Sequence, residues 1–261
     1  MAGYLWLRGH KVWSYKYEKS GAPLVLLHGG LSHSEKIIPF LLPAIEGRFS
    51  VYAFDRTGHG HTANQPGSIH FDFQRDELIA YLEDIVQQPA HLIGVSDGGN
   101  IALMVAIARP DLVLSIITIG ANTQPEQVQI SFEENPTPSQ EDRAEHLAIS
   151  PDAPEEFDKK IAKAFEVWKS EPRIAADQLA RIACPTLIMA GDDDVLSTAH
   201  SNEIFESIEN GRLAIIPGAS HSVIKEKTNL VQHVIVDFYE NLNYPITRDP
   251  VRRRFVEIEL G

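Results

Sequence analysis

Short apolar runs alternate along most of the chain with longer stretches in which apolar residues recur at helical spacing. The runs are continuous rather than alternating, as in strands covered on both faces, and they lie at residues 24–27, 51–54, 91–94, 114–119, 186–190 and 213–216. The stretches with helical spacing lie between them, at residues 34–45, 73–86, 100–108, 198–208 and 230–239. Strand and helix repeated in this order predict a doubly wound α/β fold around a mostly parallel sheet.

The two ends of the chain differ from this pattern. Residues 4–8 and 12–17 are rich in apolar and aromatic side chains on either side of Gly9 and His10, which predicts an antiparallel hairpin with its turn at these two residues. With the hairpin included, the sheet is expected to have about eight strands. The tail after Pro245 fits a late strand, a subunit contact in a homodimer or a frayed end equally well.

The strand pattern is interrupted once, between residues 122 and 182. This stretch contains acidic and proline-rich sequence at 132–138 and two segments of helical spacing, 141–147 and 155–168. One face of the second segment is apolar, through Phe157, Ile161, Phe165 and Trp168. We therefore expect a helical cap, residues 122–182, inserted into an α/β core of residues 1–121 and 183–261. The alternative, a disordered linker, is disfavoured because structureless segments of this length are uncommon in compact domains.

Composition and charge limit the class of protein. The chain has 261 residues, of which 43% are hydrophobic and 23% charged, as is ordinary for a globular protein. No apolar run approaches the ~20 residues that a membrane helix needs. The N-terminus lacks the basic and apolar regions of a secretory signal, so a cytoplasmic location is expected. The net charge of -13 disfavours nucleic acids and anionic membranes as partners.

A glycine-flanked serine follows the predicted strand at 91–94. The sequence Gly94-Val95-Ser96-Asp97-Gly98 stands between this strand and a helix rich in alanine. A serine on such a strand–turn–helix elbow adopts a strained backbone and exposes its hydroxyl, and it needs small residues two positions before and after it. The pattern predicts that Ser96 is a nucleophile, whereas an incidental serine in a glycine-rich turn is the alternative.

A serine nucleophile needs a base to take its proton and an acid to orient the base. Asp192, Asp193 and Asp194 follow the predicted strand at 186–190, and His221 follows the strand at 213–216. Parallel strands bring their carboxyl ends to one edge of the sheet, where Ser96 also lies. The chain order of serine, acid and histidine fits a hydrolase of this architecture and selects His221 as the base.

Together these motifs resemble those of the α/β-hydrolase family. The resemblance covers most of the chain, through His28-Gly29-Gly30, residues 55–60 (Asp-Arg-Thr-Gly-His-Gly), the serine elbow, residues 191–194 and residues 218–221. It implies that the backbone N–H groups of Gly30 and Asp97 form an oxyanion hole and that Asp194 is the acid of the triad. His28 is then expected to be structural. The resemblance requires no metal and no cofactor.

The acid directly after the nucleophile indicates a narrower resemblance. Ser96-Asp97-Gly98-Gly99, together with residues 120–122 and the aromatic segment ending at Trp168, is similar to the biphenyl hydrolase-like and valacyclovir hydrolase-like branch. This resemblance implies that Asp97 can face a substrate amino group and makes Trp168 a candidate for substrate contact. A helix-stabilising role at the first turn of the following helix is the alternative for Asp97.

These observations predict a serine hydrolase that cleaves a carboxylic ester or a related small acyl substrate through an acyl-enzyme. The same residues could instead hydrolyse a lactone, an amide or a carbon–carbon bond, or carry out cofactor-free perhydrolysis, because the fold does not fix the substrate. A binding protein on a hydrolase scaffold is a less favoured alternative, since such proteins usually lack a member of the triad.

Overall fold

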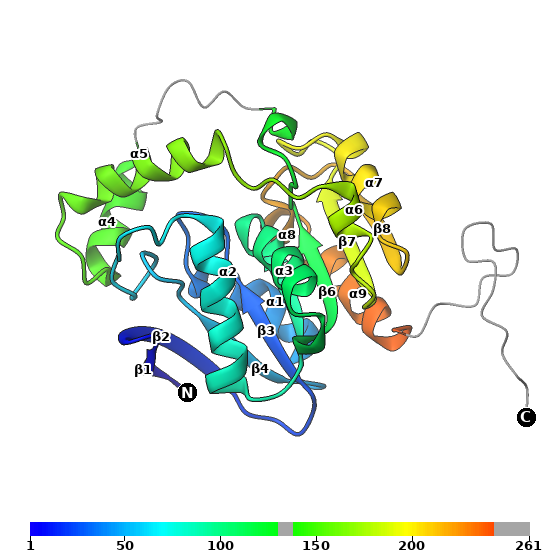
Figure 1. Ribbon diagram of the computed structural model, residues 1–261, viewed down its shortest axis with the longest axis horizontal. Helices are drawn as coiled ribbons and strands as arrows, with labels where there is room; N and C mark the ends of the chain where they lie inside the picture. The colour runs from blue at the N-terminus through cyan, green and yellow to red at the C-terminus, as the bar shows by residue number, and fades with distance from the viewer. Residues whose placement is uncertain (130–137, 243–261) are drawn as a thin grey trace, which may run out of the picture.

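One eight-stranded sheet runs through the protein in the computed structural model, which describes residues 1–129 and 138–242 (Figure 1). The strands are β1 (Ala2–Leu7), β2 (His10–Tyr17), β3 (Pro23–Leu27), β4 (Ser50–Phe54), β5 (Ala90–Val95), β6 (Val113–Ile119), β7 (Thr186–Gly191) and β8 (Gly211–Ile216). Their order is β1-β2-β4-β3-β5-β6-β7-β8; β2 is antiparallel to both of its neighbours, β1 and β4, and all other pairs are parallel. Each continuous apolar run forms a parallel strand, so the predicted α/β architecture is confirmed.

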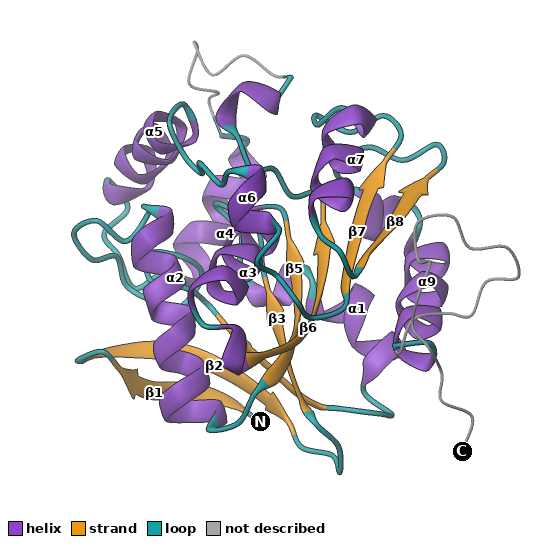
Figure 2. Cartoon of the chain, turned by 45° about the vertical axis from the view of Figure 1, so that its right-hand side comes forward, coloured by secondary structure: helices purple, strands orange, loops and turns teal. Residues whose placement is uncertain are grey.

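Helices cover both faces of this sheet (Figure 2). Those outside the region between β6 and β7 are α1 (Ile38–Ile45), α2 (Phe71–Ala80), α3 (Asp97–Ala108), α7 (Thr198–Ser207), α8 (Val223–Glu226) and α9 (Thr228–Glu240). One buried cluster joins α2, α3 and α7 to the sheet, and a second joins α1, α8 and α9 to the opposite face. The strands between these two layers are buried almost throughout, because side chains on both faces are covered.

The N-terminal hairpin forms, but its turn lies one residue earlier than expected. Leu7 pairs with His10, so the two turn residues are Arg8 and Gly9. Both have positive φ, 49° and 82°, which is typical of the two-residue turns that match the twist of a hairpin. The sequence prediction placed Arg8 in the strand because arginine rarely adopts this conformation.

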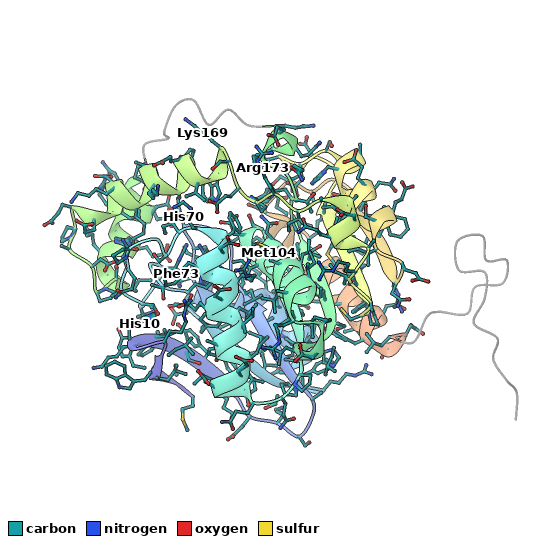
Figure 3. The ribbon with its side chains drawn as sticks, in the orientation of Figure 1. His10, His70, Phe73, Met104, Lys169 and Arg173 are labelled. Atoms are coloured by element: carbon teal, nitrogen blue, oxygen red, sulfur yellow. The ribbon has the colours of Figure 1, made fainter. Side chains whose placement is uncertain are left out.

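In the described part of the chain between β6 and β7, the α-helices are α4 (Gln140–Ile149), α5 (Glu156–Trp168) and α6 (Ala176–Leu179), and a short 3-10 helix, η4 (Pro125–Gln127), precedes them. In Figure 1, α4 and α5 lie at the upper left, on the side of α2. The chain after α5 is tied to α2, since His70 at the start of α2 donates to Glu171 over 2.7 Å (Figure 3). Arg173 forms an ion pair at 2.6 Å with Glu126, which lies in the segment after β6. The short helices α6 and α8, of four residues each, are absent from the sequence prediction.

Two features of the sequence prediction lie outside the described residues: nearly all of the acidic, proline-rich segment 132–138, and the tail after Pro245. Within the described ranges, none of the helices has the length and apolar character needed to cross a membrane.

Candidate active site

Ser96 lies on a sharp turn between β5 and α3. Its backbone has φ 53° and ψ -123°, a conformation that costs a residue other than glycine on the order of 1–3 kcal/mol. The flanking glycines allow two close backbone approaches: a Cβ at Gly94 would lie 2.2 Å from the Gly98 carbonyl oxygen, and a Cβ at Gly98 would lie 2.4 Å from that of Leu27. The chain therefore folds back on itself at the serine in the way that the glycine spacing predicted.

The turns after β7 and β8 bring an acid and a histidine to this serine. Nδ1 of His221 lies 2.7 Å from Oδ1 of Asp194, and Nε2 of His221 lies 3.0 Å from Oγ of Ser96. Since a carboxylate can only accept, the neutral ring carries its proton on Nδ1 and leaves Nε2 free to accept from the serine hydroxyl. Residues 125 positions apart in the sequence thus form one hydrogen-bonded chain.

The three aspartates after β7 have different surroundings. Asp194 has a fully buried carboxylate that faces His221. The Asp192 carboxylate accepts from the backbone N–H groups of Gly218, over 2.7 Å, and Ala219, over 3.2 Å. Asp192 thereby stabilises the turn that carries the histidine, as aspartate side chains often do.

The environment of His221 favours its protonated form. Burial lowers the pKa of His221, but the hydrogen bond that the ring donates to Asp194 and the negative charge of Asp194, with a smaller contribution from Asp97, outweigh burial and raise the pKa above its ordinary value of 6.5. The ring packs against Gly120, where a Cβ would come within 3.0 Å of both Cε1 and Nδ1. Gly120 has φ 66°, which glycine adopts readily. Sequence reasoning did not identify this contact, although the glycine after β6 was a visible signal.

The backbone N–H groups of Gly30 and Asp97 have no hydrogen-bond acceptor in the described parts of the chain. Asp97 is the first residue of α3, so its N–H has no acceptor within the helix. Gly30 belongs to the loop after β3 and lines both cavities that open at Ser96. Two such donors can stabilise the negative oxygen of a tetrahedral intermediate.

The Asp97 side chain lies below Trp168, at the end of α5. Its Oδ2 accepts a hydrogen bond from the Trp168 indole N–H over 3.0 Å, and only 8% of the residue is exposed. Burial raises the pKa of the Asp97 carboxyl, while the charge of the buried Arg56 and the indole hydrogen bond lower it in part. Both residues also contact Gly30, where a Cβ would lie 2.2 Å from Asp97 Oδ2 and 2.4 Å from Trp168 Cζ2.

Trp168 stands between two cavities that meet at the serine. The larger, of about 570 Å³, is bounded by the apolar face of α5 and includes Lys36, Lys160 and Lys225 in its walls. The smaller, of about 260 Å³, contains the carboxylates of Asp97 and Glu171 in its walls. Among the described residues, the smaller cavity is lined by no lysine or arginine. The apolar face of α5 was predicted to cover a surface, and its residues Phe157, Ile161, Phe165 and Trp168 line the larger cavity.

His28 lies under the loop that contains Gly30, as the sequence suggested. Its ring is fully buried, with Nδ1 2.7 Å from the Gly29 carbonyl oxygen and Nε2 accepting from Arg56 N–H over 3.1 Å. Burial lowers the pKa of His28 well below its ordinary value, so the ring is neutral. Within the described ranges, no group of three or more His, Cys, Asp or Glu side chains is placed to hold a metal ion.

Comparison with known proteins identifies the family of this chain. The model of the alpha/beta hydrolase family matches residues 24–229. The mouse serine hydrolase BPHL is 24% identical over 87% of this chain and 82% of its own length. The bovine monoacylglycerol lipase ABHD6 is 22% identical over 90% of this chain and 81% of its own length. The solved meta-cleavage product hydrolase CumD of Pseudomonas fluorescens IP01 superposes with a TM-score of 0.72 at 19% identity, covering 92% of this chain and 98% of its own. The chain therefore belongs to the alpha/beta hydrolase family and is a hydrolase.

Proposed function

We propose that the protein is a serine hydrolase that cleaves a carboxylic ester of a small acyl compound, with Ser96, His221 and Asp194 as its catalytic triad. The observation that carries this proposal is the unbroken hydrogen-bonded chain from Asp194 through His221 to Ser96, which opens into two cavities. The name of one relative, a monoacylglycerol lipase, supports the choice of an ester.

The reaction proceeds in two halves. Ser96 Oγ attacks the carbonyl carbon while its proton passes to Nε2 of His221, and the Gly30 and Asp97 N–H groups bind the oxyanion. The imidazolium returns this proton to the leaving alcohol, which departs and leaves an acyl-enzyme. Water, deprotonated by His221, attacks the acyl carbon, the bond from this carbon to Ser96 Oγ breaks, and the imidazolium returns its proton to Oγ as the acid leaves. Asp194 holds the ring in the tautomer that both halves require.

We further propose that residues 122–182 act as a cap that selects the substrate. The support is that α5 roofs the larger cavity with Phe157, Phe165 and Trp168. Ser96 and His221 line both cavities. Each cavity can therefore hold the part of the substrate on one side of the scissile bond. Asp97 and Trp168 are then the first substrate contacts on the side of the smaller cavity.

Hydrolysis of a carbon–carbon bond on the same triad is the second candidate, because a meta-cleavage product hydrolase shares the fold at a TM-score of 0.72. Such a substrate is a ketone with a carbanion leaving group rather than an alkoxide. A panel of acyl esters, acyl amides and vinylogous diketones, scored by kcat/KM, separates the candidates. The ester proposal expects the highest values for esters.

The experiment that tests the triad measures ester turnover by three variants. Ser96→Ala and His221→Ala are each expected to lower kcat by at least about 10⁴-fold, because members of one catalytic unit fail together. Ser207→Ala is the matched control, since its hydroxyl bonds only a backbone carbonyl of its own helix. Turnover by Ser96→Ala within tenfold of the wild type would contradict the proposal.

A further inference from the structure

A charged side chain is fully buried beneath the loop that contains Gly30. Arg56, two residues after β4, has no exposed surface. Burial lowers the pKa of its guanidinium to about 10, so the group still carries its charge at neutral pH. The nearby carboxylates of Asp97, Glu77 and Asp55 all favour that charged form. A buried charge of this kind is retained only when it is paired and hydrogen-bonded.

The guanidinium donates hydrogen bonds to main-chain carbonyl groups of the loop. Nη1 donates to the carbonyl oxygen of His28, and Nη2 donates to that of Gly29 over 3.0 Å. The Gly29 oxygen also accepts from Nδ1 of His28 at 2.7 Å, given the tautomer fixed by the bond from Arg56 N–H to Nε2. Three donors therefore hold two consecutive carbonyl groups toward the interior of the protein.

The direction of these carbonyls fixes the direction of the next N–H groups. A trans peptide is planar, and its N–H points opposite to its C=O. The Gly29–Gly30 peptide turns its oxygen toward the buried Arg56, so the Gly30 N–H points away from the interior, on the side of the cavities. Across the described residues this N–H has no protein acceptor.

We infer that Arg56 is a positioning residue that holds the Gly30 N–H in the direction of the reacting carbonyl oxygen. It acts through the Gly29–Gly30 peptide and does not touch the substrate. The inference rests on the proposed function, because it assigns Gly30 to the oxyanion hole. Arginine suits this position better than lysine, since its rigid planar fork can bind two carbonyl oxygens in a fixed geometry, whereas an ammonium is a point charge on a flexible stem.

The test compares Arg56→Lys and Arg56→Met with the wild type in ester hydrolysis and in binding of a boronic acid with the same acyl group. The boronate forms a tetrahedral adduct on the serine and places an oxygen in the oxyanion hole. Active sites are titrated with a fluorophosphonate, so that kcat refers to folded enzyme. Both variants are expected to lose about tenfold to a hundredfold in kcat, because a misplaced donor no longer stabilises the transition state.

Two further readouts separate positioning from stability. The boronate inhibition constant should rise by the same factor as kcat falls, while KM changes by less than about threefold. Arg212→Lys is the matched control, since Arg212 also donates to backbone carbonyl groups, those of Leu242, over 3.0 Å, and of Asn241. Arg212 lies at the amino end of β8, whereas the candidate site lies at the carboxyl ends of the strands. It should leave kcat and boronate affinity unchanged.

Arg56→Lys keeps the charge and is the informative variant if Arg56→Met does not fold. A lysine variant with a lower melting temperature but with kcat and boronate affinity within twofold of the wild type would overturn the inference. Turnover by Ser96→Ala would instead overturn the proposed function itself. The two failures are therefore distinguishable.

Discussion

At the scale of single residues, the aspartates after β7 are distinguished by their surroundings rather than by their type. Asp192 and Asp194 are two residues apart, yet one binds backbone N–H groups and the other faces an imidazole. The chain order of the motifs made Ser96 and His221 predictable, because each ends a strand at the same edge of the sheet. The choice among the three aspartates came only from family resemblance, since an acidic triplet gives no geometric signal of its own.

The first prediction concerns this choice. Asp194→Asn is expected to lower kcat by about 10⁴-fold, because an amide can hold the imidazole in the wrong tautomer. Asp192→Asn should cost less than about tenfold, since the amide oxygen can still accept from Gly218 and Ala219. Steady-state kinetics on an activated ester measures both. A large loss of kcat in Asp192→Asn, together with a small loss in Asp194→Asn, would show that Asp192 rather than Asp194 is the acid.

The second prediction follows from the raised pKa of His221. The base must be neutral to accept the serine proton, so activity is lost as pH falls through this pKa. Because Asp194 raises the pKa above 6.5, the acid limb of kcat/KM should have its midpoint above 6.5. A pH–rate profile from pH 5 to 9 measures it. A midpoint clearly below 6.5 would show that burial, rather than the carboxylate, dominates at this ring.

The third prediction tests whether the Asp97 carboxylate meets a substrate ammonium. The smaller cavity is lined by Asp97 and Glu171, and an ammonium there would offset the cost of burying the Asp97 carboxylate. Asp97→Asn should therefore lower kcat/KM for α-amino esters by about tenfold to a hundredfold more than for simple acyl esters, as expected for the loss of a charged hydrogen bond of roughly 1.5 to 3 kcal/mol.

The asparagine variant is a conservative probe, because its amide oxygen can still accept from the Trp168 indole and its backbone N–H remains available for the proposed oxyanion hole. General damage to the elbow cancels in the ratio of the two substrate types. Equal losses on both would assign Asp97 to helix α3 and to the contact with Trp168, and the amino-ester preference would be discarded.

At the scale of elements, the nucleophile elbow depends on how closely β3, β5 and α3 approach each other. Hydrophobic periodicity predicted these elements because strand and helix patterns are distinct over five or more residues. Single-turn elements such as α6 and α8 are too short for any periodicity, so their prediction from sequence was not feasible. The hairpin turn at Arg8 and Gly9 was misplaced for a different reason, namely a positive φ at a residue that seldom has one.

The fourth prediction concerns the contact between α3 and β3. Gly98→Ala would place a Cβ 2.4 Å from the Leu27 carbonyl oxygen and 2.7 Å from that of His28, so backbone must move. We expect a loss of unfolding free energy of about 1–3 kcal/mol and a lower kcat, because the displaced strand end leads into the loop with Gly30. Chemical denaturation and ester kinetics measure both effects.

Gly47→Ala is the control for this change, since a Cβ at Gly47 meets no atom within 4 Å. It should leave stability and kcat unchanged to within about 0.5 kcal/mol and twofold. If Gly98→Ala behaves like Gly47→Ala, the close approach of helix and strand is not what shapes the elbow.

At the scale of the whole molecule, the site is an assembly of loops from one edge of the sheet beneath helix α5. Loops after β3, β5, β7 and β8 supply Gly30, Ser96, Asp194 and His221, as expected for ligand sites at the carboxyl ends of parallel strands. The two cavities could not be predicted from the sequence, because their shape depends on how α5 packs over Gly30. The contacts of Arg56 also could not be predicted, because a sequence does not show which carbonyl groups a buried guanidinium will bind.

The central claim is that Ser96 is the nucleophile, and labelling with a fluorophosphonate tests it most directly. Ser96 Oγ would bond to phosphorus, fluoride would leave, and His221 would take the hydroxyl proton. Intact-mass and peptide mass spectrometry should find one adduct per chain, on the peptide that contains Ser96. The adduct should be absent from Ser96→Ala and should form far more slowly on His221→Ala. An adduct on another residue, or full ester turnover by a chain that takes no label, would contradict the account.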